Sequence, residues 1–324
     1  PALMRGQYDL CLFTYEKFSA LVLGSPFLLD QIGTIIIDEV QMIADETRGV
    51  NLEFLLTLLR VRRQQGIEPQ LIALSAVIGS SNGLERWLGG RILRREERPV
   101  PLNEGILKTD GSFRYIDSTG NVNEEQSYIQ RIWNKNSSQD WVIPLVRRLV
   151  SEGKQVIVFR ETRPETRGCA LYLARELGLS PAQEAIGALP LGDPSGASHA
   201  LREALSGGVA FHNSNLDREE RLIIEEHFRA PNSTLRVLVA TTTLAMGVNT
   251  PAEAVVIVGL EHPGPRPYSI AEYKNLAGRA GRLGYSTKGL SFLLALGANE
   301  ENYFWTRYVL GKPEEIQSKF FVNT

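Results

Sequence analysis

Two arginines in the last quarter of the chain are placed where they could hold an anion. Arg279 and Arg282 lie three residues apart in NLAGRAGR (275–282), among glycines and alanines too small to shield them. If this stretch is helical, positions i and i+3 share a face, and both guanidinium groups can converge on one target. A planar fork of donors suits a carboxylate or a phosphate. The alternative is an exposed basic helix end without a ligand, and the pair alone does not decide between the two.

Two adjacent carboxylates follow an apolar run earlier in the chain. In IIIDEVQ (35–41), Asp38 and Glu39 come directly after three isoleucines. Ligands of open α/β sheets bind outside the carboxyl ends of the strands, so acidic side chains can be functional here. One carboxylate could hold Mg²⁺ together with water and phosphate oxygens. The second could orient or deprotonate an attacking water. The alternative is a turn or helix N-terminus, where the dipole favours acids.

Polar residues also end two further strand candidates. Ser75 in LIALSAV (71–77) could cap a following helix, or could hydrogen-bond Gln41 at the end of a neighbouring strand. The run RVLVATTTLAMGVNTP (236–251) passes from a strand into three consecutive threonines. Hydroxyl and amide groups at such a turn can hold nucleic-acid phosphates without reading base sequence. Ordinary turn chemistry is the alternative.

Alternating strands and helices are expected to position these residues. Short β-branched runs, apolar on both faces, alternate with amphipathic helical patterns such as 51–65 and 218–229. This is typical of parallel strands covered by helices on both sides. The strand candidates are 9–13, 34–38, 70–75, 155–159, 208–211, 236–240, 254–258 and 291–296. The stretch 99–140 breaks the rhythm, because it is rich in Asp, Asn, Ser and Gly.

Composition limits the class of protein. With 324 residues and 43% hydrophobic residues, the chain can bury a large core and form about two domains. A formal net charge of -2 argues against nucleic-acid binding by bulk charge alone, although not against a basic channel. The two cysteines lie far apart and the four histidines show no paired spacing, so neither a zinc site nor a disulfide framework is expected. Without a membrane-length apolar run or a signal peptide, we expect an intracellular protein of the cytoplasm, nucleoid or nucleus, with no membrane partner.

Together these motifs resemble the superfamily 2 helicases of the DEAD/DEVH-box type. DEVQ, SAV, VIVFRETR, VLVATTTLAMGVNTPA and NLAGRAGR stand in the order and spacing of that family, and TYEKF, FHNSNLDREER and RPVPLNEGIL match it further. They are most similar to the branch of archaeal repair helicases and exosome-associated RNA helicases. The resemblance covers essentially the whole chain. It implies an α/β fold with two RecA-like, doubly wound parallel-sheet lobes that hold ATP between them and bind nucleic acid across both.

The resemblance also implies domain boundaries and roles for single residues. The expected parts are the C-terminal part of an incomplete first lobe (1–98), a linker with short β structure (99–140), the second lobe (141–300) and the lead-in to an absent winged-helix domain (301–324). The implied catalytic residues are Asp38, Glu39, Gln41, Ser75, Arg279 and Arg282. Of these, the implied Mg²⁺ ligands are Asp38 and Glu39. The residues expected near ATP are Gly247, Asn249, Asn275 and Gly278. The residues expected to contact nucleic acid are Thr14, Arg160, Thr162, His212, Thr241 and Thr242.

The chain departs from the family pattern at several points. Asn275 stands where the family has a glutamine, and FHNSN replaces an FHH-like motif. The stretch 259–272, where relatives carry a strand-separating hairpin, holds three prolines, so any wedge should be short. No phosphate loop of the form G-x-x-x-x-G-K-[ST] occurs. We therefore expect a fragment of a longer protein that binds ATP poorly as it stands.

The sequence thus predicts the truncated motor core of an ATP-dependent helicase or translocase. By family analogy it moves 3′ to 5′ on single-stranded or tailed duplex nucleic acid, with DNA slightly favoured over RNA; the oligomeric state stays open. A first alternative is a nucleic-acid-stimulated ATPase that remodels complexes without unwinding. A second is a hydrolysis-dead binding module, against which the intact acidic pair and arginine pair argue.

Overall fold

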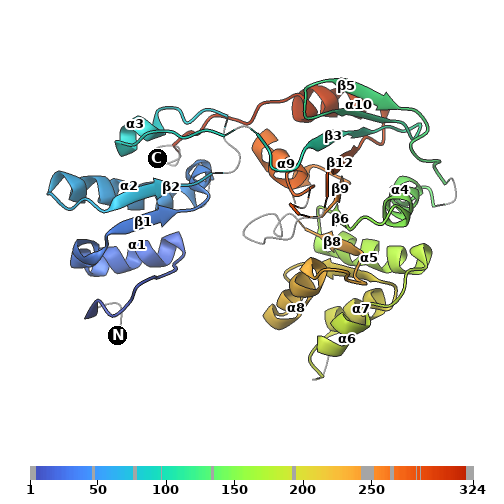
Figure 1. The fold of residues 1–324 in the computed structure, drawn as a ribbon, viewed down its shortest axis with the longest axis horizontal. Helices are drawn as coiled ribbons and strands as arrows, with labels where there is room; N and C mark the ends of the chain where they lie inside the picture. Colours follow the sequence, from blue (N-terminus) through green and yellow to red (C-terminus); the bar gives the residue numbers. More distant parts are fainter. Residues whose placement is uncertain are drawn as a thin grey trace. The chain divides into compact units, whose positions relative to one another are not determined.

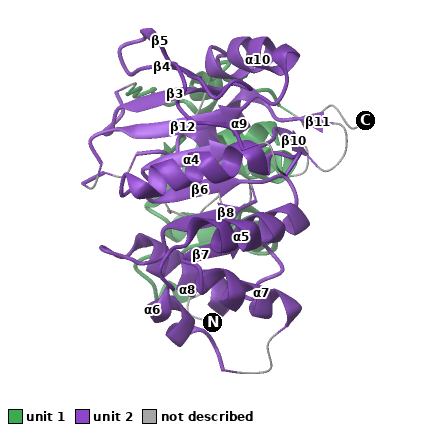
Figure 2. Cartoon of the chain, turned by 90° about the vertical axis from the view of Figure 1, so that its right-hand side faces the viewer, with its two compact units in different colours: residues 1–95, 313–324 green, residues 96–312 purple. Residues whose placement is uncertain are grey.

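The computed structural model describes residues 5–45, 48–75, 79–95, 97–132, 135–191, 195–241, 252–262, 266–281, 283–284 and 286–318 (Figure 1). The chain divides into two compact units, which Figure 2 colours separately. Unit 1 comprises residues 1–95 and 313–324, and unit 2 comprises residues 96–312. Both units are of the predicted α/β class. No described helix is long and apolar enough to cross a membrane.

Unit 1 contains a two-stranded parallel sheet. Strand β1 (Thr34–Ile37) pairs with β2 (Gln70–Ala73), and the 16-residue helix α2 (Gly49–Gln64) connects them. Leucines recur on α2 at the helical spacing of i, i+3, i+4 and i+7, and all four are buried. The other helical segments of the unit are α1 (Tyr15–Gly24), α3 (Leu84–Leu88) and the 3-10 turns Pro26–Gln31 and Val40–Ala44.

The faces of β1 differ in exposure. Ile35 and Ile37 are buried in the core of unit 1, whereas Ile36 between them is 60% exposed. The expected burial of both faces is therefore found on only one face of this strand. The strand expected over 9–13 is absent: this described stretch is irregular, and Leu12 in it is 88% exposed. A strand needs a hydrogen-bonding neighbour, and no described strand pairs with this run.

Unit 2 is built on an eight-stranded sheet in the order β5-β4-β3-β12-β9-β6-β8-β7. Six strands from β3 to β7 in this order run parallel, and β4 and β5 add an antiparallel edge. The strands are β3 (Leu102–Leu107), β4 (Phe113–Ile116), β5 (Val122–Glu125), β6 (Val156–Phe159), β7 (Val209–His212), β8 (Val237–Ala240), β9 (Ala254–Ile257) and β12 (Gly289–Leu294). Every residue of β6, β7, β8 and β9 is buried, as expected for covered parallel strands.

Unit 2 also contains helices between and after the strands of this sheet, and a short hairpin that forms a separate two-stranded sheet. The helices are α4 (Gln139–Ser151), α5 (Arg163–Leu177), α6 (Gln183–Ala188), α7 (Gly196–Leu205), α8 (Arg218–Arg229), α9 (Ile270–Ala277), α10 (Ala298–Phe304) and a π-helical turn (Trp305–Val309). The hairpin strands β10 (Glu261–His262) and β11 (Arg266–Pro267) have two residues each. This confirms the prediction that any hairpin between 259 and 272 is short.

Two stretches have partners that the sequence did not reveal. The strands of 99–140, expected as part of a linker, continue the sheet of unit 2 through the pairing of β3 with β12. The stretch 313–318 lies in unit 1, where Ile316 joins the core. The Ile316 amide donates to the Ser80 carbonyl (3.0 Å), and the Asn82 side chain donates to the Ile316 carbonyl (3.0 Å). The chain therefore passes between the units twice, at 95–96 and at 312–313. The assignment of 301–324 as a lead-in to another domain stays a prediction.

Candidate nucleotide and nucleic-acid sites

The acidic pair lies directly after β1, at its carboxyl end. Asp38 is exposed, and its Oδ1 accepts a hydrogen bond from the Glu39 amide at 2.9 Å. The Tyr15 hydroxyl donates to the Asp38 carbonyl. Glu39 has a φ of 53°, in the left-handed region that non-glycine residues rarely adopt. Backbone strain of this kind persists where neighbouring structure enforces it and is enriched at functional sites.

A chain of side-chain hydrogen bonds holds the Glu39 carboxylate. The Gln41 amide donates to Glu39 Oε2, and the Ser75 hydroxyl donates to Gln41 Oε1. Ser75 follows β2, so this series of hydrogen bonds links the ends of the neighbouring strands β1 and β2. Of the two possibilities that the sequence left open for Ser75, its hydrogen bond to Gln41 is present. These two hydrogen bonds fix the orientation of the Glu39 carboxylate relative to the exposed Asp38.

The donor set fits a magnesium ion. Mg²⁺ in nucleotide sites is usually held by one or two carboxylates and keeps several waters and phosphate oxygens. Asp38 and Glu39 offer two carboxylates at one strand end, with Asp38 open to solvent. No group of three or more His, Cys, Asp or Glu side chains suited to a metal occurs in the part of the chain that the structure describes. The arrangement therefore suits a shared protein–phosphate site rather than an all-protein cage.

Arg279, the described member of the predicted arginine pair, is not carried by a helix. Helix α9 ends at Ala277, two residues before Arg279, so the expected shared helical face is wrong. The backbone turns away at Gly281, whose φ of 97° is left-handed, and Ala280 forms a parallel bridge with Ala252. The Ala252 amide donates to the Arg279 carbonyl at 3.1 Å. Arg279 thus projects from a turn that is fixed by a distant segment, which helical spacing could not reveal.

Several predicted residues lie in or near this turn or outside the described structure. Asn275 is half-buried in the last turn of α9, and Gly278 is exposed at its C-cap. Their expected contact with ATP stays a prediction. The predicted residues outside the described part of the chain are Thr242, Gly247, Asn249 and Arg282.

Three predicted nucleic-acid contacts meet at one edge of the unit 2 sheet. Arg160, Thr241 and His212 lie at the carboxyl ends of the adjacent strands β6, β8 and β7. The Arg160 amide donates to the Ala240 carbonyl at 2.9 Å, and the Thr241 amide donates to the His212 carbonyl at 3.4 Å. The sheet thus brings together residues that are up to 81 positions apart in the sequence. This is the edge at which open α/β sheets bind ligands.

Thr162 begins the helix that follows β6. Its hydroxyl accepts from the Glu165 amide (3.4 Å), and Glu165 accepts from the Thr162 amide (3.1 Å), which completes a capping box at the start of α5. Thr14 has a similar place in unit 1, where its hydroxyl accepts from the Lys17 amide at the start of α1 (3.3 Å). Both threonines therefore serve as helix caps. The Thr162 hydroxyl also donates to Glu165 Oε2 at 3.0 Å, so it would have to give up this bond to donate to a phosphate.

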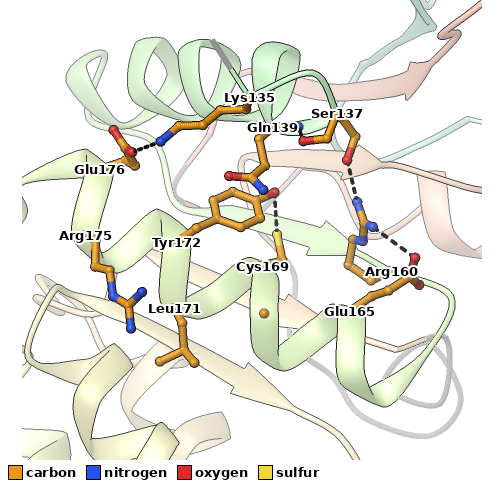
Figure 3. Close-up of a pocket in the computed structure, with 12 residues that line it drawn as sticks. Lys135, Ser137, Gln139, Arg160, Glu165, Cys169, Leu171, Tyr172, Arg175 and Glu176 are labelled. Atoms are coloured by element: carbon orange, nitrogen blue, oxygen red, sulfur yellow. Dashed lines mark hydrogen bonds and ion pairs between the residues drawn. The ribbon is translucent and has the colours of Figure 1, made fainter.

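Arg160 points into a pocket of about 640 Å³ beside α4 and α5 (Figure 3). Its guanidinium donates to the Ser138 hydroxyl (3.1 Å) and pairs with Glu165 (3.1 Å). The other cations that line the pocket are also paired: Lys135 contacts Glu176 at 2.8 Å, and Arg175 contacts an acid of α7 at 2.6 Å. A phosphate at this edge would therefore have to compete with Glu165 for Arg160.

The thiol in this pocket is inert. Burial raises the pKa of Cys169 to about 11, and its Sγ donates to the Tyr172 hydroxyl at 3.0 Å. A protonated, enclosed thiol is a poor nucleophile and a poor metal ligand. Both cysteines were expected from the sequence to be small buried residues; Cys169 is buried, whereas Cys11 is only half-buried.

His212, a predicted nucleic-acid contact, is almost fully buried. The side chain is 6% exposed, and its Nε2 lies 2.8 Å from Glu225 Oε1. Burial lowers the pKa of His212, and Glu225 opposes this shift. Its Nδ1 has no partner among the described residues. Direct contact with a nucleic-acid strand would require His212 to leave Glu225, so this contact stays a prediction.

Two contacts at these sites were missed by sequence reasoning. Tyr15 lies next to the predicted Thr14 and reaches Asp38 across 23 residues. Arg98 donates to the carbonyls of Gly278 and Ala280 on either side of Arg279. Tyr15 lies in TYEKF and Arg98 opens RPVPLNEGIL, but neither motif shows which distant segment the side chain contacts.

Known proteins resemble the chain over nearly its full length. A profile described as "Helicase conserved C-terminal domain" matches residues 195–284. The ATP-dependent DNA helicase Hel308 of Pyrobaculum calidifontis is 34% identical over 328 residues, which cover 96% of this chain and 43% of the relative. The Hel308 of Caldivirga maquilingensis is 34% identical over 332 residues (98% and 42%), and that of Thermoplasma volcanium is 32% identical over 317 residues (96% and 43%).

The chain spans less than half the length of these curated relatives. Within that length, the matched regions include the acidic pair of unit 1 as well as the sheet edge and the Arg279 turn of unit 2. The resemblance inferred from the motifs is confirmed: the chain is similar to superfamily 2 helicases and, among them, to those of the archaeal repair branch.

Proposed function

We propose that this chain is part of the motor of an ATP-dependent DNA helicase that moves 3′ to 5′ along single-stranded or tailed duplex DNA. The observation that carries the proposal is the hydrogen-bonded chain from Ser75 through Gln41 to Glu39, beside the exposed Asp38. A turn or helix cap needs no such relay between two strand ends. A carboxylate that must orient one water molecule does need it, because misplacement of a catalytic group is costly.

The roles of the acidic pair follow from their placement. Asp38 would contribute a carboxylate to Mg²⁺, and Glu39 would orient the attacking water or accept its proton. Bound Mg²⁺ would neutralise charge that develops on the phosphate oxygens. Arg279 and Arg282 would stabilise the same charge from unit 2, as arginine fingers do, with an effect of roughly 10³–10⁵ on rate.

The nucleic-acid track would run along the sheet edge of unit 2. Arg160, Thr162 and Thr241 would contact phosphates there through guanidinium and hydroxyl groups, which hold phosphates irrespective of base sequence. Arg160 and Thr162 would first have to give up their contacts with Glu165. Thr14 of unit 1 and Thr242 would add further contacts. Cycles of ATP binding and hydrolysis would change the arrangement of the two units and so move the strand.

One observation favours a second candidate, a DNA-stimulated ATPase that remodels complexes without unwinding. The hairpin of β10 and β11 has strands of only two residues. A wedge this short offers little surface to separate two strands. Unwinding and ATP hydrolysis must therefore be measured separately.

The proposal is tested on the complete gene product by ATP hydrolysis with and without single-stranded DNA. We expect DNA to stimulate hydrolysis, and Glu39→Gln to abolish it while ATP binding persists. Glu68→Gln is the matched control, because Glu68 is an exposed carboxylate in the same unit. Unwinding of a duplex with a 3′ tail but not a 5′ tail would support a 3′ to 5′ helicase. Stimulated hydrolysis without unwinding would favour the remodeller, and hydrolysis indifferent to DNA or unaffected by Glu39→Gln would refute both.

A further inference from the structure

Arg98 lies where the chain enters unit 2, as the third residue after the boundary with unit 1. Its guanidinium reaches across 180 residues of sequence to the end of helix α9. There Nη2 donates to the carbonyl of Gly278 at 3.0 Å and to the carbonyl of Ala280 at 3.1 Å. These two residues flank Arg279, so one side chain holds the backbone on both sides of the predicted finger.

A cation suits this position for two reasons. The last carbonyls of a helix lack partners within the helix, and a positive charge near the C-terminus is favourable. Ala280 is fully buried, so its carbonyl has little access to water. A buried carbonyl that loses its donor is costly. Arg98 therefore supplies the donor that lets the turn after α9 stay closed.

The rest of the entry segment packs against the same turn. The Gly289 amide donates to the Pro101 carbonyl at 2.8 Å. A Cβ on Gly281 would come within 2.9 Å of a methyl carbon of Val100, which shows how closely the two segments approach.

Helix α9 is itself held from β3, the strand that follows the entry segment. Lys274 Nζ pairs with Glu104 Oε1 at 2.7 Å and also donates to the Val309 carbonyl at 2.7 Å. Both partners of the ion pair are mostly buried, with side-chain exposures of 20% and 11%. The helix before Arg279 and the turn that carries it are thus both anchored to the stretch that begins at Arg98.

We propose that Arg98 is a positioning residue for Arg279: it touches no substrate, and it sets the backbone from which the finger reaches the γ-phosphate. The inference rests on the proposed function, which gives Arg279 that role. Under this proposal, Arg98 at the start of unit 2 determines the position of Arg279, a residue needed for hydrolysis.

The test is a double-mutant cycle in the complete gene product, with kcat and KM of DNA-stimulated ATP hydrolysis as readouts. A misplaced catalytic group can lose about 10²-fold in rate, so Arg98→Ala should lower kcat by about 10- to 100-fold. The KM for ATP, nucleotide affinity and DNA affinity should stay within about twofold, the pattern of an interaction made only in the transition state. Arg98→Lys, which keeps a charged donor, should recover part of the loss. Arg95→Ala removes an exposed charge from the neighbouring stretch and should have no effect.

The Arg279→Ala background distinguishes the possible failures. If Arg98 acts through Arg279, Arg98→Ala in that background should lower kcat by less than about twofold further. An equal loss in both backgrounds, or a rise in KM together with weaker DNA binding, would overturn the positioning role and leave the proposed function standing. Full activity of Arg279→Ala itself would overturn the proposed function. If Arg98→Ala fails to fold, as judged by its thermal melt, the Arg98→Lys cycle decides in the same way.

Discussion

The hydrogen-bonded chain at the acidic site makes a graded prediction for three substitutions. Gln41→Ala removes the donor to the Glu39 carboxylate, a bond to a charged group worth about 1.5–3 kcal/mol. Ser75→Ala removes only the outer bond between neutral groups, worth about 0.5–1.5 kcal/mol. If this energy serves to orient Glu39, then kcat should fall about 10- to 100-fold for Gln41→Ala and about 2- to 10-fold for Ser75→Ala, since about 1.4 kcal/mol is tenfold in rate. Glu39→Gln should be the most severe.

The assay is steady-state ATP hydrolysis by the complete gene product at saturating ATP and DNA. Ser75→Ala should add nothing in the Gln41→Ala background, because Ser75 acts through Gln41 alone. Ser81→Ala is the matched control: it removes a hydrogen bond from a serine to the Glu85 carboxylate in the same unit (2.7 Å), away from the acidic pair. The reasoning is refuted if Ser75→Ala costs more than Gln41→Ala, or if the two losses multiply in the double variant.

Three further outcomes follow from unit 2. Lys274→Met should lower the free energy of unfolding by about 3 kcal/mol in a denaturant titration, because it leaves Glu104 buried without its partner; a loss below about 1 kcal/mol would contradict this. Gly281→Ala should destabilise more than Gly284→Ala in thermal melts, because both have positive φ (97° and 82°) but, among the described residues, only Gly281 has neighbours within 4 Å of an added Cβ; equal losses would show that backbone strain alone decides. At pH 8 the Cys169 thiol, with a pKa of about 11, should be about 0.1% thiolate. Its alkylation should rise with pH and should be far slower in the native than in the denatured protein, and equal rates would contradict its burial.

Sequence reasoning succeeded where the determinants are local. Helix α8 begins and ends at the predicted residues 218 and 229, because its start carries a capping box and its apolar residues repeat at helical spacing. Strand β1 was found from three consecutive isoleucines. The bond between Ser75 and Gln41 was one of two possibilities left open by the sequence, and it was considered because both residues follow strands and neighbouring parallel strands end at the same edge.

Sequence reasoning failed where a distant segment decides. The stretch 9–13 has the composition of a strand, but a strand also requires a paired neighbour, which its own residues do not specify. NLAGRAGR was considered as a helix, yet α9 ends at Ala277, and Ala280 forms a bridge with the distant Ala252. The strands of 99–140 were expected to lie in a linker, because their sequence does not show that β3 pairs with β12.

The Arg279 turn is the point at which these long-range contacts converge. Arg98 reaches it from the segment that enters unit 2, and Ala252 reaches it from a segment that begins eleven residues earlier at Thr241. Under the proposed function, Thr241 would contact the DNA backbone and Arg279 would contact ATP. Ala252 itself is joined to the turn by two hydrogen bonds: its amide donates to the Arg279 carbonyl at 3.1 Å, and its carbonyl accepts from the Gly281 amide at 2.8 Å. Under the proposed function, a displacement of Arg98 would therefore change the backbone of the turn that carries Arg279.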